Sequence, residues 1–555
     1  MKIEHFIKYL FLILLPTINY SQTIVSPLEI PLNISGTFGE LRNTHFHTGV
    51  DIKTNGKQGL KVKSIKEGYL ERIRVSKSGY GKSIYIKHTD GTSSVYAHLK
   101  KFSEKVEKYV KEIQYKKQSY EIQSFPEANL LNFKAGELVG FSGNTGGTSG
   151  PHLHLELRDS KTNSPINPIA NGIEVIDTIK PIINGLFLYR VYEDGKYDFL
   201  EKVKIKKVKD GLYIASKIKF SGRLGVGLNY FDRQDRSYSK NGVYSLDFKI
   251  NNNPIFYYKM DRLSFNDRKH LKLLIDYNKW STERTKIQKL FTHPKSKYTF
   301  INQSNPYGVF TILENESSKG NIKMIDFNGN TTNINLQFEG VIKDSIKNNY
   351  NTNTINPDYE YNIELKGIGV RFPKNSFYDP INININSIND TLYLGEDIHP
   401  MNKSFEINFK INSNDSIKLR KGFISKINKY GRARFMKTKK IDNIWSTKAY
   451  SLGTYSLSID TIPPTIRPIN FKKNQWISNL KYLKLKVKDD LSGIKSIKGY
   501  INGKWVLFEH ETKNSTITYD FSDLYFPDGK HFLKIEIEDL NGNKSIYEEV
   551  FLKKY

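Results

Sequence analysis

Short runs in which apolar and polar residues alternate occur along most of this chain. Leu60–Ile65 and Ser83–His88 are early examples, and the turn Asp90-Gly91 separates the second run from a third at Ser94–Tyr96. Alternation with a period of two is typical of half-buried β-strands, and Asp-Gly favours a tight hairpin. The pattern predicts a mainly β protein, in which His88 is a solvent-facing strand residue beside the turn.

A helical period interrupts this alternation after residue 100. The apolar residues that recur at helical spacing are Phe102, Val106, Tyr109, Val110 and Ile113. Ser103 is placed to cap the helix, and Glu104 lies in its first turn. We expect a helical insertion in a β-rich domain. The insertion is either a wall of a groove or a packed decoration, and the sequence favours neither.

A weak internal repeat divides the rest of the chain. Asp177–Ile182 (DTIKPI) and Asp460–Thr465 (DTIPPT) each precede a long series of alternating runs, and each series ends in a related turn, Asp326–Asn330 (DFNGN) or Asp539–Asn543 (DLNGN). Many short strands with Asn-Gly turns are typical of β-sandwiches. We therefore expect immunoglobulin-like β-sandwiches at residues 177–345 and 460–555. The second of these, with Asp489–Gly493, resembles bacterial immunoglobulin-like modules.

The region between the two repeats is less distinctive. An Asn-rich stretch, Asn348–Asn356, is the best candidate for a linker. Alternating runs continue beyond it, so we expect a third β domain at residues 346–459.

Residues 1–21 have the features of a secretory signal peptide. Lys2 and Lys8 supply a positive start, Tyr9–Leu15 is a short apolar run, and Pro16 ends it. The apolar run is too short for a stable membrane span, and no other stretch approaches that length without charges. We expect an exported protein of the bacterial periplasm or cell surface with no membrane span.

Composition narrows the function further. A chain of 555 residues is too long for one core, so several domains are expected. The absence of cysteine excludes a disulfide framework, a thiolate metal site and a lipid anchor. The net charge is +28, but the basic residues are spread along the chain without a nucleic-acid-binding motif. Nucleic acid is therefore not an expected partner, whereas weak attraction to anionic envelope polymers fits the charge.

Six of the twelve histidines lie between His45 and His154. In the run His152–Leu157 (HLHLEL), alternation predicts a strand with His152, His154 and Glu156 on one face. In the run His47–Asp51 (HTGVD), the Gly and the β-branched residues favour a strand or tight loop. Two imidazoles and a carboxylate with a fourth position left to water form a typical catalytic zinc site. The alternative is that these histidines are ordinary core or loop residues.

These motifs resemble those of the lysostaphin-type (LytM-domain) zinc metallopeptidases of bacterial peptidoglycan. The resemblance runs from about Gly36 to Pro168 and includes GTFG at 36–39, GYG at 79–81, YAHL at 96–99, GNTG at 143–146 and PHLH at 151–154. It implies a LytM-type peptidase domain at residues 22–176. It also implies that His47, Asp51 and His154 bind one Zn²⁺, and that His98 and His152 are catalytic residues outside the zinc ligands.

The resemblance implies a secreted zinc metalloendopeptidase that hydrolyses peptide bonds in peptidoglycan cross-links or stem peptides. The alternative is a non-catalytic cell-envelope binding protein or an activator of a wall amidase, since the family contains members that have lost ligands. All five positions are filled here, which favours a working enzyme.

Overall fold

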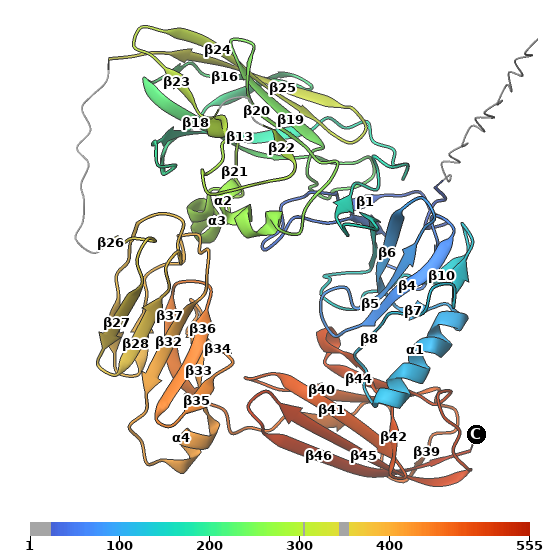
Figure 1. Cartoon of the computed structure of the whole chain (residues 1–555). Coiled ribbons are helices and arrows are strands. Elements are labelled where there is room, and N and C mark those ends of the chain that lie inside the picture. Colours follow the sequence, from blue (N-terminus) through green and yellow to red (C-terminus); the bar gives the residue numbers. More distant parts are fainter. Residues whose placement is uncertain (1–23, 303–305, 343–353, 555) are drawn as a thin grey trace, which may run out of the picture.

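The computed structural model describes residues 24–302, 306–342 and 354–554. The predicted signal peptide and the first part of the Asn-rich linker candidate lie outside these residues. Strands form most of the regular structure, which confirms the prediction of a mainly β protein. Four β-rich units follow one another around a ring, coloured blue, green, gold and red in Figure 1. The boundaries between these units are the predicted ones and stay predictions.

The first unit, residues 24–176, contains one long helix, α1 (Glu104–Lys117). Its strands are β1 (Ile34–Gly36), β2 (Val50–Lys53), β3 (Lys61–Lys63), β4 (Gly68–Val75), β5 (Lys82–Lys87), β6 (Thr92–Leu99), β7 (Lys101–Phe102), β8 (Ile122–Ser124), β9 (Asn132–Phe133), β10 (Leu138–Phe141), β11 (His152–Asp159) and β12 (Pro165–Ile166). The large sheet has the order β1-β2-β11-β6-β5-β4-β8, and β3-β10-β7 form a second, small sheet.

The centre of the large sheet brings the histidine motifs of the sequence together. Strand β11 pairs antiparallel with β2 on one side and with β6 on the other. In this register His154 lies opposite Asp51 on β2 and opposite Ala97 on β6. Directly opposed residues on neighbouring strands have adjacent side chains, so three strands supply one site. Leu153 and Leu155 point to the other face and are fully buried, as the alternation predicted.

The predicted helical insertion is confirmed as α1, which buries Val106 and Val110. Ser103 occupies the N-cap position, but its side chain makes no capping hydrogen bond. Instead, the Glu107 carboxylate accepts from the backbone N–H of Phe102 at 3.0 Å. This bond ties the first turn of the helix to the residue before its N-cap, and the acidic Glu104 and Glu107 in that turn favour the positive end of the helix dipole.

The prediction that His88 faces solvent is wrong. Its side chain is only 4% exposed. Nδ1 donates to the carbonyl oxygen of Glu67 at 2.7 Å, and Nε2 lies 2.9 Å from Oγ of Ser94. The residue follows β5, which lies inside the sheet between β4 and β6, so neighbouring segments cover a position that the local pattern leaves exposed.

The second unit, residues 177–342, contains two sheets with the orders β14-β13-β18-β21 and β15-β16-β25-β24-β19-β20-β22. Its strands are β13 (Ile182–Val191), β14 (Tyr197–Val203), β15 (Ile205–Lys209), β16 (Leu212–Ala215), β17 (Ile218–Lys219), β18 (Gly222–Phe231), β19 (Ser245–Ile250), β20 (Asn253–Lys259), β21 (Gln288–Lys289), β22 (Ile301–Asn302), β23 (Phe310–Ile312), β24 (Ser317–Ile325) and β25 (Thr331–Glu339). Its α-helices are α2 (Leu271–Leu274) and α3 (Tyr277–Glu283).

The third unit, residues 354–459, has two five-stranded sheets, β27-β28-β32-β36-β35 and β30-β31-β37-β33-β34. Its elements are β26 (Thr354–Ile355), β27 (Tyr361–Leu365), β28 (Ile368–Phe372), β29 (Ile381–Asn382), β30 (Asn386–Ile388), β31 (Thr391–Tyr393), β32 (Phe405–Lys410), α4 (Ser416–Lys421), β33 (Gly422–Ile427), β34 (Ala433–Phe435), β35 (Lys439–Ile441), β36 (Ile444–Ala449) and β37 (Thr454–Ile459).

The fourth unit, residues 460–554, also has two sheets, β38-β40-β44-β43 and β39-β46-β45-β41-β42. Its strands are β38 (Thr465–Pro468), β39 (Gln475–Trp476), β40 (Tyr482–Lys488), β41 (Ile494–Ile501), β42 (Lys504–Val506), β43 (Glu509–Glu511), β44 (Thr516–Asp520), β45 (Gly529–Asp539) and β46 (Lys544–Lys553). In the third and fourth units, residues from both sheets share one core. This is a sandwich arrangement; the immunoglobulin-like connectivity stays a prediction.

The hydrophobic cores do not follow the four units one to one. The third and fourth units each have a core of their own. In contrast, one continuous cluster of buried residues joins the first unit to the second. Phe46 meets Phe300 edge-on with ring centroids 5.1 Å apart, and the Asn167 side chain donates to the carbonyl of Met260 at 2.9 Å. The first two units therefore pack as one body.

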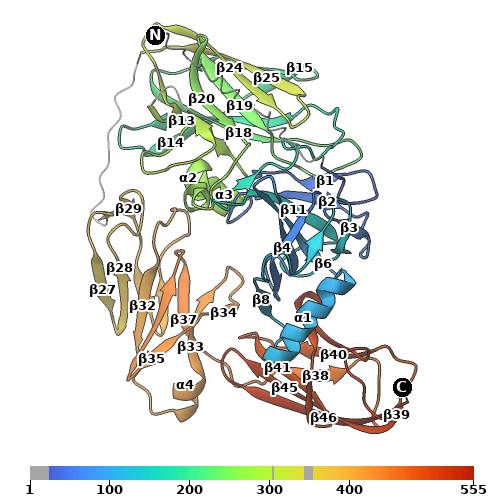
Figure 2. The same ribbon diagram turned by 45° about the vertical axis from the view of Figure 1, so that its right-hand side comes forward.

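The ring closes because the fourth unit lies against the first (Figures 1 and 2). Tyr115 of α1 packs edge-on against Trp505, with ring centroids 5.3 Å apart. Lys111 of the same helix pairs with Asp523, and Lys82 pairs with Glu509 at 2.7 Å. The helical insertion therefore serves as a docking surface for the end of the chain.

The remaining junctions in the ring include polar contacts, and at the junction of the second and third units the buried Tyr378 also packs against His270 and His293. His293 of the second unit lies 2.9 Å from Asp379 of the third. Between the third and fourth units, the Asn541 side chain donates to the carbonyl of Lys421 at 2.8 Å. Within the described part of the chain, every helix is too short or too polar to cross a membrane.

Candidate metal centre

Three side chains converge at the centre of the large sheet. Nε2 of His47 lies 3.0 Å from Oδ1 of Asp51 and 3.1 Å from Nδ1 of His154. Nδ1 of His154 lies 2.8 Å from the same Asp51 oxygen. All three residues are buried. Two nitrogens and one carboxylate oxygen from β2, its preceding loop and β11 thus face a common point and form a group that could hold a metal ion.

The partners of each ring nitrogen fix which one faces that point. Nδ1 of His47 donates to the carbonyl of Thr37 at 2.8 Å, which leaves the Nε2 lone pair for the centre. Nε2 of His154 lies 2.9 Å from Oε1 of Glu156, which leaves Nδ1 for the centre. Metal-binding histidines typically donate their second N–H to a carbonyl or carboxylate in this way. The donor set and its supports fit a three-ligand zinc site.

Neighbouring groups of opposite charge stabilise the cluster of His47, Asp51 and His154. Arg42 donates to the other oxygen of Asp51 at 2.8 Å. Burial acts to raise the pKa of Asp51, but the charge of His47 and hydrogen bonds from His152, His154 and His47 hold that pKa well below its usual range. Burial acts to lower the pKa of His154, but Asp51 and Glu156 raise it to about 9. Without a metal, the site therefore holds a proton where a cation would bind.

Glu156 is the residue on which this support depends. It is fully buried, and Arg158 contacts its Oε2 at 2.6 Å. Thr48 donates to its Oε1 at 2.6 Å, and the Tyr80 hydroxyl donates to the same atom. Burial acts to raise the pKa of Glu156, but Arg158 and His154 hold it far below the ordinary value. A buried carboxylate thus stays ionised and orients His154.

His98 lies beside the cluster at the end of β6. Its φ of 61° is left-handed, which is uncommon for a residue other than glycine. Its backbone N–H donates to Tyr80, and its Nδ1 donates to the carbonyl of Thr145 at 2.8 Å. Burial, together with the neighbouring His154 and His152, lowers the pKa of His98 to about 3. The ring is therefore neutral near pH 7, with its lone pair on Nε2.

His152 completes the cluster from the start of β11. Its Nδ1 donates to the carbonyl of Gly150 at 2.9 Å, and its Nε2 lies 3.4 Å from Oδ1 of Asp51. The rings of His98 and His152 have centroids 4.9 Å apart. The structure thus brings all five predicted site residues together, while the role of each stays a prediction. His45 is exposed and lies outside the cluster.

Other residues of the site were not assigned from the sequence. Arg42, Tyr80 and Arg158 were missed, and Glu156 was placed on the correct face without a role. The sequence did indicate where Arg158 lies, because the alternation of β11 places it on the same face as His154 and Glu156. The sequence holds no comparable signal for Arg42, whose contact with Asp51 depends on a loop conformation.

A loop of the first unit links the site to the fourth unit. Asn144 precedes Thr145, whose carbonyl holds His98. Lys513 of the fourth unit donates to the side-chain oxygen of Asn144 at 2.9 Å. The docked fourth unit therefore contacts a loop that positions a predicted catalytic residue.

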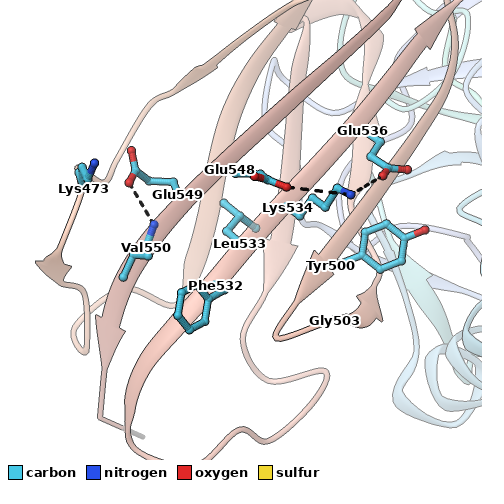
Figure 3. Close-up of a pocket in the computed structure, with 10 residues that line it drawn as sticks. All are labelled: Lys473, Tyr500, Gly503, Phe532, Leu533, Lys534, Glu536, Glu548, Glu549 and Val550. Atoms are coloured by element: carbon cyan, nitrogen blue, oxygen red, sulfur yellow. Dashed lines mark hydrogen bonds and ion pairs between the residues drawn. The ribbon is translucent and has the colours of Figure 1, made fainter.

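A pocket on the fourth unit lies away from the histidines (Figure 3). Phe532, Tyr500 and the β45–β46 strands line it, and Lys534 lies between Glu536 at 2.9 Å and Glu548 at 4.0 Å. Ion pairs between neighbouring strands are ordinary features of a solvated sheet face. The pocket therefore adds no candidate chemistry to the metal centre.

Two parts of the chain match known protein families. Residues 45–115 match the model for peptidase family M23, and residues 352–460 match the model for a Zu5-like domain. A Neisseria meningitidis protein named DD-carboxypeptidase/endopeptidase Mpg is 31% identical over 151 residues, which are 26% of this chain and 28% of that protein. Lysostaphin of Staphylococcus simulans is 32% identical over 124 residues, 22% of this chain and 20% of that protein.

Among solved structures, the catalytic domain of S. simulans lysostaphin is 26% identical and covers 25% of this chain and 86% of that domain, with a TM-score of 0.18. The chain spans less than a third of the length of these curated relatives. The family model and the similar protein sequences confirm the resemblance seen in the sequence: residues 45–115, within the first unit, match peptidase family M23.

Proposed function

We propose that this protein is a secreted zinc metalloendopeptidase that hydrolyses peptide bonds in peptidoglycan cross-links or stem peptides. The observation that supports this most directly is the convergence of His47, Asp51 and His154, with His98 and His152 beside them. The similar proteins, a DD-carboxypeptidase/endopeptidase and lysostaphin, support this reaction class. Export would follow from the signal peptide predicted at residues 1–21.

Each residue of the site has a separate role in the proposed hydrolysis. A zinc ion held by His47, Asp51 and His154 would polarise the scissile carbonyl and lower the pKa of a bound water molecule. His98, neutral with its lone pair on Nε2, accepts the proton of the attacking water. His152, next to His98, would stabilise the developing charge, and the proton that His98 has taken from the water would pass to the leaving amine. Glu156 keeps His154 oriented throughout.

The test compares zinc content with peptide-cleavage rate on the same protein preparations. In His98→Ala and His152→Ala we expect about one zinc per chain but a rate reduced by about a hundred to ten thousand times. In His154→Ala zinc and activity should fall together. His45→Ala is the matched control, because His45 is an exposed neighbour outside the cluster, and it should behave as wild type.

The substrate in this test is purified sacculi, with released muropeptides as the readout. Wild-type rates in both His98→Ala and His152→Ala would refute the catalytic assignment. A wild-type protein that holds zinc but releases no muropeptide would favour the non-catalytic envelope-binding alternative instead. Weak attraction of the cationic chain to anionic envelope polymers is a separate proposal, measured by salt-dependent binding to them.

A further inference from the structure

The internal repeat seen in the sequence gathers aspartates twice, at two places far from the histidines. Asp177, Asp232 and Asp326 form one cluster, in which one oxygen of each residue lies within 4.8 Å of the others. Asp460, Asp489 and Asp539 form a second cluster by the same criterion. We call these the first and second aspartate clusters.

The two clusters are built from equivalent positions. Asp177 and Asp460 precede the strands of the second and fourth units. Asp232 directly follows β18, and Asp489 directly follows β40. The third aspartate stands at a DxNGN turn, which connects β24 to β25 in the first cluster and β45 to β46 in the second. The same three-part arrangement thus occurs in two separate units.

The turn holds the first and third aspartates of each cluster together. In the first cluster, Oδ1 of Asp326 accepts from the backbone N–H groups of Asn328 at 2.8 Å and Asn330 at 2.9 Å. The Asn330 side chain donates to the backbone carbonyl of Asp177 at 2.9 Å and to Oδ2 of Asp326 at 2.8 Å. The repeated motif therefore has a structural role: it presents carboxylates to one another.

The second cluster repeats these bonds. Oδ1 of Asp539 accepts from the backbone N–H groups of Asn541 at 2.9 Å and Asn543 at 2.8 Å. The Asn543 side chain donates to the carbonyl of Asp460 at 3.0 Å and to Oδ2 of Asp539 at 2.8 Å. Asp489 adds a carboxylate from a loop in which its Oδ2 accepts from Gly493.

Each cluster contains a deeply buried carboxylate oxygen without a hydrogen-bond donor. Asp232 is 2% exposed, and its Oδ1 accepts no hydrogen bond from the described residues. Asp460 is 3% exposed, and its Oδ2 likewise has no donor within the described part of the chain. Leaving a buried acceptor without a partner is costly, and more so when it is charged. An unpartnered oxygen in both clusters therefore indicates a ligand that binds there.

The charge of that ligand follows from the surroundings. The chain has a net charge of +28, yet the charged groups that act on Asp232 are the other two carboxylates of its cluster. Burial, and then these two neighbours, raises the pKa of Asp232 to about 9; burial chiefly raises the pKa of Asp177 to about 6. Three carboxylates at this spacing must either take up protons or bind a cation.

We propose that each aspartate cluster binds one calcium ion. Carboxylate oxygens are the ligands of hard divalent cations, and neither cluster includes the histidine or cysteine that zinc favours. Magnesium usually keeps several of its waters, whereas calcium accepts a larger set of protein oxygens in a flexible geometry. The buried position of Asp232 and Asp460 therefore favours calcium over magnesium. This inference is independent of the proposed peptidase activity.

Both clusters lie where one unit meets the preceding one. The Asn328 side chain donates to the carbonyl of Val175, the last part of the first unit, at 2.6 Å. At the other junction, the Lys421 side chain donates to the carbonyl of Gly542 at 3.1 Å. Calcium would therefore fix the orientation of the second unit on the first and of the fourth unit on the third.

The test is calorimetric titration of calcium chloride into the full mature chain after treatment with a chelator. We expect two equivalents of calcium for wild type, one for Asp232→Asn, one for Asp489→Asn, and none for the double variant. Asp490→Asn is the matched control, because Asp490 neighbours Asp489 but is exposed and pairs with Lys488. It should keep two equivalents. Zinc content should be the same in all five proteins.

Three results would overturn the proposal. The first is that the wild-type protein does not bind calcium at millimolar concentration. This result does not depend on whether any variant folds. The double variant, folded by circular dichroism, could keep two equivalents. Magnesium could bind with the same stoichiometry and affinity as calcium, which would contradict the assignment of the ion. An upward shift in the thermal unfolding midpoint of wild type on adding calcium, absent in the double variant, would support it.

Discussion

Replacing Glu156 by Gln tests whether the buried carboxylate behind His154 holds the metal centre together. The substitution keeps the shape of the side chain but removes its charge. Arg158, which is 5% exposed, then loses the carboxylate that contacts it at 2.6 Å. Nε2 of His154 loses a charged acceptor at 2.9 Å and keeps at most a neutral one.

Two magnitudes follow from these contacts. Removing one partner of a buried ion pair leaves the other charge uncompensated and typically costs about 3–5 kcal/mol of stability. Weakening the group that orients a metal-binding histidine typically reduces metal affinity by about 10–100 times. We therefore expect Glu156→Gln to unfold at lower denaturant concentration and to bind zinc more weakly, even though Glu156 is not among the predicted ligands.

The assay has two parts. Urea unfolding of the fragment 22–342, followed by circular dichroism, gives the change in the free energy of unfolding, and competition with a chromophoric chelator gives zinc affinity. Glu71→Gln is the control, because Glu71 is a half-exposed carboxylate of the same sheet that lies 3.9 Å from Lys87, and it should change stability by less than about 0.5 kcal/mol. A loss below about 1 kcal/mol together with unchanged zinc affinity in Glu156→Gln would refute the reasoning.

Three further predictions concern the rest of the chain. A fragment that ends at Pro181 should have a lower thermal midpoint than residues 22–342, because it divides the continuous core; equal midpoints would contradict this. Burial lowers the pKa of Lys289 to about 7, so the folded state binds fewer protons than the unfolded state above that pH. Stability of residues 22–342 should then rise between about pH 7 and 10.5, by at most about 5 kcal/mol, and Lys289→Met should remove this rise. Trp505→Ala should weaken the contact with Tyr115 and increase the radius of gyration measured by X-ray scattering, whereas an unchanged radius would mean that other contacts suffice.

The parts of the site that follow from local pattern could be predicted. Alternation in β11 gave the shared face of His152, His154 and Glu156, because side-chain direction on a strand depends only on sequence parity. The helical period of residues 102–113 gave α1 for the same reason. Which residues join the cluster was inferred from a family resemblance, and the structure brings those residues together.

Features that depend on distant segments could not be predicted. The burial of His88 is set by the strands on either side of it, and the support of Asp51 by Arg42 is set by a loop. The contact between Lys111 and Asp523 joins residues about four hundred positions apart, and nothing in either local sequence indicates the other. The alternation of apolar and polar residues within each unit likewise does not indicate that the first two units share one core.

The contact between the fourth unit and α1 is an intramolecular one, so its strength depends on the part of the chain that connects the two surfaces. The two surfaces belong to one chain, so the folded second and third units that connect them, and not the concentration of the protein, fix their effective local concentration. A few modest contacts can therefore keep the ring closed at any dilution, and a competing ligand for either surface must overcome that concentration. Opening would release Asn144 from Lys513 while each core stays folded, so the loop that carries Thr145 would change its freedom without any change in its own sequence.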